Sequence, residues 1–168
     1  AVDLRPEMFT GSQCYRADTA CRLAALCLWQ AARNGDRCAA SVFSVHGIQT
    51  SRPRTAERGV LEALGLITDC YDAARAKGAT ADSQPLDQWL AFLNAAGRVS
   101  GNLLLFSGLD NAGQAIDTEL LIAAGHGRLT TIAITDPLES NALPPGRYPF
   151  IRENRSMAVS LSRRSRKS

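Results

Sequence analysis

The run Asn-Leu-Leu-Leu-Phe at residues 102–106 decides the fold class of this chain. A strand that is apolar at nearly every position is typical of a parallel sheet whose two faces are both covered. A second such run, residues 129–134, is rich in β-branched side chains, which favour a strand. Stretches with helical periodicity lie between and around these runs. The alternation predicts an α/β fold with a mainly parallel sheet and helices on both of its faces.

Four helices are expected from the spacing of apolar residues. Over residues 19–33 these recur at the i, i+3, i+4 and i+7 positions of one helix face, and Asn34–Gly35 ends the pattern. Leu26 and Trp29 make this helix apolar around much of its girth, so we expect it to be deeply buried. The other helices are expected over about 55–76, with Thr55 as its cap, and over about 85–97 and 116–125.

The remaining strands are expected to be short. Residues 2–4 form the end of a first strand, and a strand over 38–45 precedes 48–51, which could pair back as a hairpin. A loop is expected over 138–146, which contains paired prolines. A terminal hairpin is predicted from residues 148–151 and 156–161.

Length and composition indicate one ordinary globular domain. The 168 residues are 45% apolar and 21% charged, which suits a single hydrophobic core. We expect this domain to span residues 1–162, with 163–168 as a solvated basic tail. Removing the four cationic residues of the tail changes the formal charge from +3 to −1, so no nucleic-acid partner is expected. No run of apolar residues is long enough to predict a membrane span.

Cysteine usage bears on the location of the protein. The five cysteines are an odd number, and none forms a Cys-x-x-Cys pair. This usage predicts a reduced, cytoplasmic protein with neither a disulfide framework nor a zinc site.

Three loops are candidates for a ligand site because of their position. In open α/β sheets, ligands bind outside the carboxyl ends of the strands, where the strand order reverses. The loops at residues 3–11, 79–84 and 107–113 qualify. Asp3 is the best single candidate, because a carboxylate at the end of a buried strand must be solvated, hydrogen bonded or paired. For Asp82, Ser83 and Asn111 we expect a purely local role, capping helices and turns. For Asp3, a local structural role is the alternative.

Signatures of common enzymes are missing from the sequence. There is no Gly-x-x-x-x-Gly-Lys-Ser/Thr loop, no Gly-x-Gly-x-x-Gly after a strand and no Gly-x-Ser-x-Gly elbow. A haloacid-dehalogenase-like phosphatase needs a second aspartate two positions after the first, where Arg5 stands. His46 and His126 lie at expected turns, without a carboxylate or nucleophile nearby in sequence. We therefore predict a non-enzymatic protein; a small hydrolase or phosphatase with Asp3 as nucleophile is an alternative.

Several segments resemble a known family. They are Asp-Leu-Arg-Pro-Glu-Met-Phe-Thr-Gly-Ser at 3–12, the stretch 24–37 with its Gly-Asp turn, Asp-Pro-Leu-Glu at 136–139 and Leu-Pro-Pro-Gly-Arg-Tyr at 143–148. Together they resemble DUF58, a bacterial family of unknown function, over nearly the whole chain. The resemblance implies a von Willebrand factor A-like domain in the carboxyl half of a longer protein. Family members often occur beside MoxR-type AAA+ ATPases, which implies an adaptor or assembly role with such an ATPase as partner.

The A-domain fold usually carries a metal-ion-dependent adhesion site. Its pattern is Asp-x-Ser-x-Ser after the first strand, a threonine from a second loop and an aspartate from a third. The resemblance places Asp3 at the first ligand and Thr80 at the threonine, but Arg5 and Glu7 stand at the two serines. At the third loop, Gly108 occupies the aspartate position, and Asp110 follows two residues later.

These exchanges predict a degenerate site. A hard Mg²⁺ ion requires oxygen ligands, and a fixed positive charge ~4 Å away would repel a unit charge by ~4 kcal/mol at an effective dielectric of ~20. We expect Arg5 to pair with Asp3 or Glu7 in place of the ion, with no bound metal or cofactor. The predicted partner-binding face comprises Asp3, Arg5, Glu7, Thr80 and Asp110. The alternative is a domain that still captures a carboxylate through Mg²⁺ held by Asp3, Glu7 and Thr80.

Overall fold

A computed structural model describes residues 1–77, 82–95, 101–140, 146–152 and 155–161. The chain divides into two compact units, Ala1–Thr135 and Asp136–Ser168. The first unit contains the sheet, the long helices and the candidate site, and it is described first.

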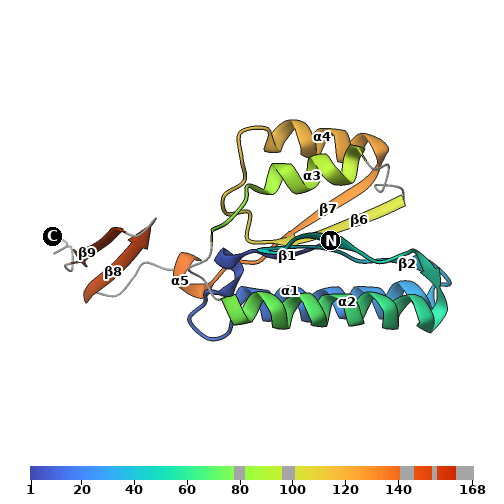
Figure 1. Ribbon diagram of the computed structural model, residues 1–168, viewed down its shortest axis with the longest axis horizontal. Coiled ribbons are helices and arrows are strands. Elements are labelled where there is room, and N and C mark those ends of the chain that lie inside the picture. Colours follow the sequence, from blue (N-terminus) through green and yellow to red (C-terminus); the bar gives the residue numbers. More distant parts are fainter. Residues whose placement is uncertain (78–81, 96–100, 141–145, 153–154, 162–168) are drawn as a thin grey trace, which may run out of the picture. The chain divides into compact units, whose positions relative to one another are not determined.

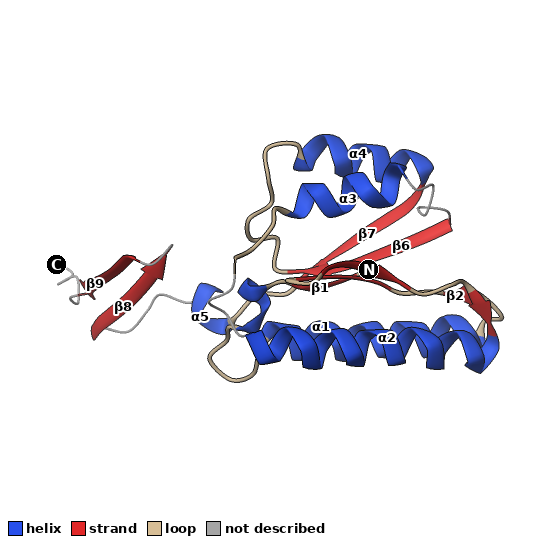
Figure 2. Cartoon of the chain, in the orientation of Figure 1, coloured by secondary structure: helices blue, strands red, loops and turns tan. Residues whose placement is uncertain are grey.

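A five-stranded sheet with the order β4-β3-β1-β6-β7 forms the centre of the first unit (Figure 2). Four of its strands run parallel, and β4 pairs antiparallel with β3 at the edge. This arrangement confirms the mainly parallel sheet and the hairpin predicted for residues 48–51. The strands are β1 (Val2–Leu4), β3 (Ser41–Ser44), β4 (Gly47–Thr50), β6 (Gly101–Ser107) and β7 (Gly127–Ala133).

Helices cover both faces of this sheet, as expected (Figure 1). The two long helices α1 (Arg16–Arg33) and α2 (Ala56–Lys77) lie side by side on one face, and α3 (Leu86–Ala95) and α4 (Ile116–His126) lie on the other. A short 3-10 helix, η1 (Pro6–Phe9), follows β1.

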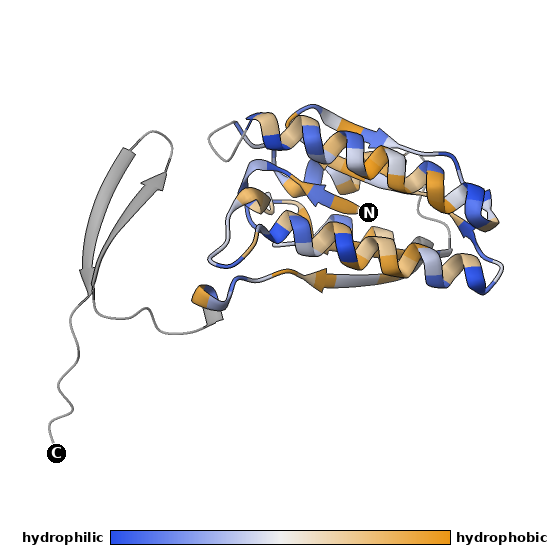
Figure 3. Ribbon diagram, turned by 90° about the horizontal axis from the view of Figure 1, so that it is seen from below, coloured by the Kyte–Doolittle hydropathy of each residue, from blue (hydrophilic) through white to orange (hydrophobic). Residues whose placement is uncertain are grey.

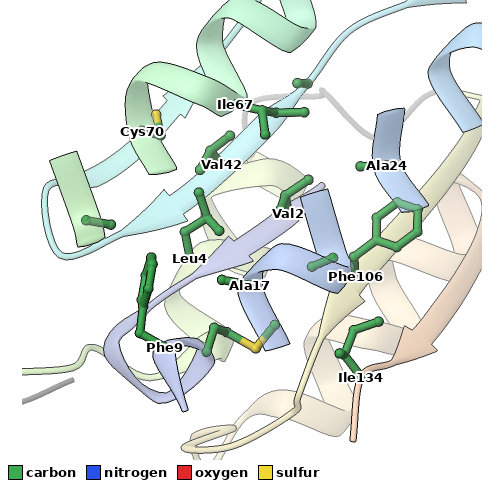
Figure 4. Close-up of a cluster of buried hydrophobic side chains, with 14 of the residues drawn as sticks. Val2, Leu4, Phe9, Ala17, Ala24, Val42, Ile67, Cys70, Phe106 and Ile134 are labelled. Carbon is green, nitrogen blue, oxygen red and sulfur yellow. The ribbon is translucent and has the colours of Figure 1, made fainter. Parts of the chain in front are cut away.

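Each face of the sheet has its own apolar core. Figure 4 shows the core beneath α1 and α2, in which Val2, Leu4 and Val42 of the sheet lie with Ala17 and Ile67 of the helices. The opposite core is built around Trp89 and Phe43, whose ring centroids are 5.5 Å apart. Because β1 contributes to one core and its neighbours to both, the carboxyl end of β1 is held firmly between the two layers.

The strand expected over residues 38–45 is confirmed over Ser41–Ser44, but the chain belongs to a different strand at the beginning of that range. β2 (Arg37–Cys38) pairs with β5 (Arg54–Thr55) in a separate two-stranded sheet, while β3 belongs to the main sheet. Thr55 ends β5, and α2 begins directly after it at Ala56, which has a φ of 54°.

The expectation that the first helix is buried around its girth is wrong. Leu26 is 67% exposed and Trp29 is 38% exposed, because the sheet covers only one side of α1. Figure 3, coloured by hydropathy, shows apolar residues along both long helices. The helix also begins three residues earlier than expected, at Arg16. Among the described residues, no helix combines the length and the apolar character needed to cross a bilayer.

The second unit contains α5 (Pro137–Ser140), β8 (Gly146–Arg152) and β9 (Arg155–Leu161), and the two strands pair antiparallel. The loop predicted from residue 138 is wrong over α5. The Asp136 carboxylate accepts a hydrogen bond from the Leu138 amide at 2.8 Å, and the Glu139 carboxylate accepts one from the Asp136 amide at 3.2 Å. This reciprocal arrangement is a capping box, and Pro137 suits the first helical position.

Candidate functional site

The candidate site lies at the carboxyl edge of the sheet, between β1 and β6. The chain passes from β1 to β3 on one side and returns to β6 on the other, so the strand order reverses at β1. Such a reversal is the usual place for a ligand site in an open α/β sheet. The loops after β1 and β6 and the segment before α3 converge there, through contacts of one side chain, Arg5.

Asp3 and Arg5 form a buried, two-pronged ion pair. Arg5 Nε donates to Asp3 Oδ1 at 3.0 Å and Nη2 donates to Oδ2 at 2.9 Å, and each residue is only 1% exposed. The backbone amide of Arg5 also donates to Asp3 Oδ1 at 3.0 Å. The local sequence supports this geometry, since Pro6 begins η1 and Arg5 stays extended before it. The Arg5 side chain thus folds back onto the end of β1, the strand that precedes it.

The remaining guanidinium donors of Arg5 connect three segments of the chain. Nη1 donates to the carbonyl oxygens of Gln84 and Asn111, each at 3.0 Å, and Nη2 donates to that of Asp110 at 2.7 Å. A guanidinium has five N–H donors, and these contacts with the two to Asp3 account for all of them. The charge also lies 5.6 Å from the centroid of the Phe43 ring, within the range of a cation–π interaction.

Ser107, at the end of β6, completes the surroundings of Asp3. Its hydroxyl donates to Asp3 Oδ2 at 2.6 Å and accepts a hydrogen bond from the Leu109 amide at 2.9 Å. The Asp3 carboxylate therefore accepts four hydrogen bonds, from Arg5 and Ser107. The sequence placed Ser107 in a candidate loop but gave no reason to assign it to the site.

A second arginine, Arg16, holds the outer part of the site and was missed from the sequence. Its Nη1 pairs with Asp110 Oδ2 at 2.8 Å, and Nη2 donates to the Glu7 carbonyl at 2.7 Å and to Thr10 Oγ1 at 3.1 Å. The signal depends on the start of the helix, which was expected at residue 19: Arg16 is the first residue of α1, and a cation is unfavourable at the amino end of a helix dipole. A cation there indicates a partner elsewhere.

Gly108 leaves room for the ion pair of Arg16 with Asp110. A Cβ at Gly108 would lie 2.6 Å from Asp110 Oδ2 and 2.7 Å from Arg16 Nη1. The residues that follow are in the left-handed region, Leu109 with a φ of 61° and Asn111 with 42°. This conformation is unfavourable for leucine. The Leu109 side chain is also 36% exposed.

The structure brings together four of the five predicted site residues. Asp3 and Arg5 form the buried centre, the Asp110 carbonyl binds Arg5, and the Glu7 carboxylate accepts a hydrogen bond from Ser83 Oγ at 2.8 Å. Thr80 lies outside the described residues. The Ser83 and Asn111 side chains link the loops, since Asn111 Nδ2 donates to the Ser83 carbonyl at 3.2 Å. For Asp82 the structure shows only that the residue is exposed.

The donor set at Asp3 does not fit a divalent cation. Both carboxylate oxygens are bonded to Arg5, and a guanidinium fills the space in front of them. Within the described ranges, no group of three or more His, Cys, Asp or Glu residues is arranged to hold a metal ion. The arrangement can connect loops and fix their shape.

Comparisons with known proteins identify the family. The family model described as "Protein of unknown function DUF58" matches residues 1–167, nearly the whole chain. Neither the curated proteins nor the solved structures contain a significant match. The chain therefore belongs to the DUF58 family, as the resemblance in its sequence indicated.

Proposed function

We propose that this chain is a non-enzymatic protein-interaction domain with a von Willebrand factor A-like fold, in which Arg5 takes the place of the divalent ion of an adhesion site. One observation carries the proposal: all five N–H donors of Arg5 are bonded, to the Asp3 carboxylate and to carbonyls from two other loops. A metal ion in an A-domain would likewise connect the strand end to neighbouring loops. Here a permanent, covalently attached cation makes those connections.

Electrostatics supports this assignment. A buried carboxylate and a buried guanidinium balance each other, and separating a divalent ion from water to place it beside a fixed positive charge is unfavourable. Removing one partner of such a pair costs about 3–5 kcal/mol. The pair therefore favours a fixed architecture over an exchangeable ligand.

Recognition would take place on the rim around the buried pair. The Asp110 side chain is 40% exposed, Glu7 is half-buried, and Leu109 is exposed. Arg16 and Arg5 tie these loops to α1 and β1. Such bonding pre-organises a surface, which lowers the entropy cost of binding a partner.

The two alternative functions require Asp3 to be reachable. A nucleophile must contact its substrate, and a metal ligand needs a free oxygen lone pair facing the ion. Asp3 is 1% exposed and accepts four hydrogen bonds. We therefore favour recognition over a hydrolase using Asp3 and over Mg²⁺-dependent binding by Asp3, Glu7 and Thr80.

A MoxR-type AAA+ ATPase is our proposed partner, on the association that accompanies the family resemblance. The test is affinity capture of a MoxR-type ATPase by the wild-type chain and by the rim variants Leu109→Asp and Glu7→Lys. We expect the wild type to retain the ATPase and both variants to lose it. The matched control is Leu121→Asp, an equally polar change at an exposed leucine on α4.

Two results would count against the proposal. If both rim variants still captured the ATPase as well as the wild type does, the rim would not take part in the interaction. Calorimetric binding of Mg²⁺ or Mn²⁺ tighter than ~100 µM, a limit chosen for a genuine site, and lost in Asp3→Ala would favour the metal-dependent alternative.

A further inference from the structure

A groove between α1 and α2 forms a second surface, separate from the buried Arg5 pair. It has a volume of about 360 Å³, and its lining includes Tyr15, Asp18 and Arg22 on one side and Thr68, Tyr71 and Arg75 on the other. Arg22, Thr68 and Arg75 are exposed, so the groove opens to solvent.

The aromatic wall of this groove is held in place from behind. The Phe9 ring lies 5.9 Å from the Tyr15 ring and 5.6 Å from the Tyr71 ring, between centroids. The Tyr71 hydroxyl donates to Asp18 Oδ1 at 2.5 Å. The one carboxylate that lines the groove is thus already bonded, and the two tyrosines present fixed faces to a ligand.

Two arginines line the groove, Arg22 on α1 and Arg75 on α2. Among the described residues, neither Arg22 nor Arg75 makes a hydrogen bond or an ion pair, in contrast to Arg54, which pairs with Glu62 at 3.5 Å. Asp72 is one helical turn from Arg75, but the two groups are not within 4.0 Å of each other. Two guanidinium groups, which bind carboxylates with two parallel hydrogen bonds, are therefore available.

Exposed apolar side chains continue this surface along both helices. Trp29 is seven residues after Arg22, and Leu61 is seven residues before Thr68. Seven residues are two helical turns, which returns to the same helix face about 10 Å further along. Trp29 is 38% exposed and Leu61 is 61% exposed. Each helix thus shows a polar, cationic end and an apolar continuation on one outward side.

We propose that this groove binds an acidic amphipathic helix of a partner protein. Its carboxylates would bind Arg22 and Arg75, and its apolar residues would cover Trp29 and Leu61. Trp29 is seven residues from Arg22, about two turns, and Leu61 is fourteen residues from Arg75, about four turns. An acidic occupant is chosen because its charge complements Arg22 and Arg75, which make no ion pair with a described residue. A helix is chosen because the exposed positions along the groove repeat every seven residues, which is two helical turns. This interaction goes beyond the proposed function, since it involves neither Arg5 nor the rim of that site.

The test uses synthetic peptides of known sequence as probes. A fluorescein-labelled helical 18-residue peptide with two glutamates two turns apart, and two leucines two turns after the second glutamate, is titrated with the whole chain, and anisotropy is measured. The comparison peptide carries glutamine at both glutamate positions. We expect the acidic peptide to bind about tenfold more tightly than the glutamine peptide at low salt, and to weaken as salt is added.

Variants of the protein identify the groove as the site. The double change Arg22→Glu/Arg75→Glu should weaken the acidic peptide by about tenfold or more. Arg58→Glu, at an exposed position in the first turn of α2, is the matched control and should leave binding unchanged. The neutral pair Arg22→Gln/Arg75→Gln repeats the test, and circular dichroism verifies that each variant is folded.

Three outcomes would overturn this proposal. They are no binding of the acidic peptide, equal binding of both peptides, and equal loss of binding in Arg58→Glu and in the double variant. Vesicles of phosphatidylcholine with phosphatidylserine serve as a further probe. Binding to these vesicles that depends on Arg22 and Arg75 and exceeds binding to the peptide would assign the groove to an anionic membrane surface instead.

Discussion

Replacing Arg5 by methionine is the most informative single change to this protein. Methionine keeps much of the length of the side chain but removes all five N–H donors. Asp3 would then be a buried carboxylate without a cation, and the carbonyls of Gln84, Asp110 and Asn111 would lose a donor. Breaking a buried ion pair from one side costs about 3–5 kcal/mol, a large share of the roughly 5–15 kcal/mol that stabilises a typical domain.

Urea unfolding followed by tryptophan fluorescence measures this loss. With a slope of about 2 kcal/mol per molar urea, the expected midpoint of Arg5→Met falls by about 2 M. Arg58→Met is the matched control, because Arg58 is exposed, and its cost should stay within about 0.5 kcal/mol. The double variant Asp3→Leu/Arg5→Met removes both charges and should be more stable than Arg5→Met by at least ~1 kcal/mol.

Either of two results would show that Asp3 and Arg5 are not a coupled, stabilising pair. One is a cost for Arg5→Met within about 1 kcal/mol of that for Arg58→Met. The other is additivity: the double variant loses as much free energy of unfolding as Asp3→Leu and Arg5→Met lose separately when added together, which is how uncoupled residues behave.

Three further predictions concern the surroundings of the site and the α1–α2 groove. Gly108→Ala should open the ion pair beside it and lower the free energy of unfolding by about 1–2 kcal/mol, whereas Gly65→Ala, with open space around its Cβ, should be neutral or stabilising. Partial burial, and then a hydrogen bond to a carboxylate, raises the pKa of Tyr71 from 10.0 to about 12. The contribution of the protonated Tyr71 hydroxyl to the free energy of unfolding is therefore complete below pH 10 and is lost as the pH rises to about 12. The stability difference between the wild type and Tyr71→Phe should shrink over that interval. A constant difference would contradict this prediction. Burial raises the pKa of Cys21 to about 12, so iodoacetamide at pH 8, mapped by mass spectrometry, should label the exposed Cys14 well before Cys21; the reverse order would be inconsistent with this structure.

The sheet could be predicted because its signal is local. Residues 102–106 and 129–134 are rich in apolar or β-branched side chains, which are typical of strands in a parallel sheet. The expected burial holds at Leu105 and Phe106 of β6 but not along β7, where Thr130, Thr131 and Ala133 are exposed. Leu26 and Trp29 show the limit of this reasoning. Their apolar character favours burial, yet both side chains are exposed on α1. Periodicity identifies a core face, but it does not say what covers the rest of a helix.

The connections of the site could be predicted only in part. Arg5 pairs with Asp3, two residues away, and that contact follows from local sequence and charge. Its bonds to Gln84 and Asn111 span 79 and 106 residues, and nothing in the local pattern specifies them. The role of Arg16 was missed for the same reason, since its carboxylate partner is Asp110 on a distant loop.

The most direct test of the central claim is a crystal structure of the chain grown in a large excess of magnesium chloride. The account predicts planar density for the Arg5 guanidinium, bonded to both Asp3 oxygens and to the carbonyls of Gln84, Asp110 and Asn111. An octahedral density peak coordinated by the Asp3 carboxylate, with the Arg5 side chain displaced, would contradict it.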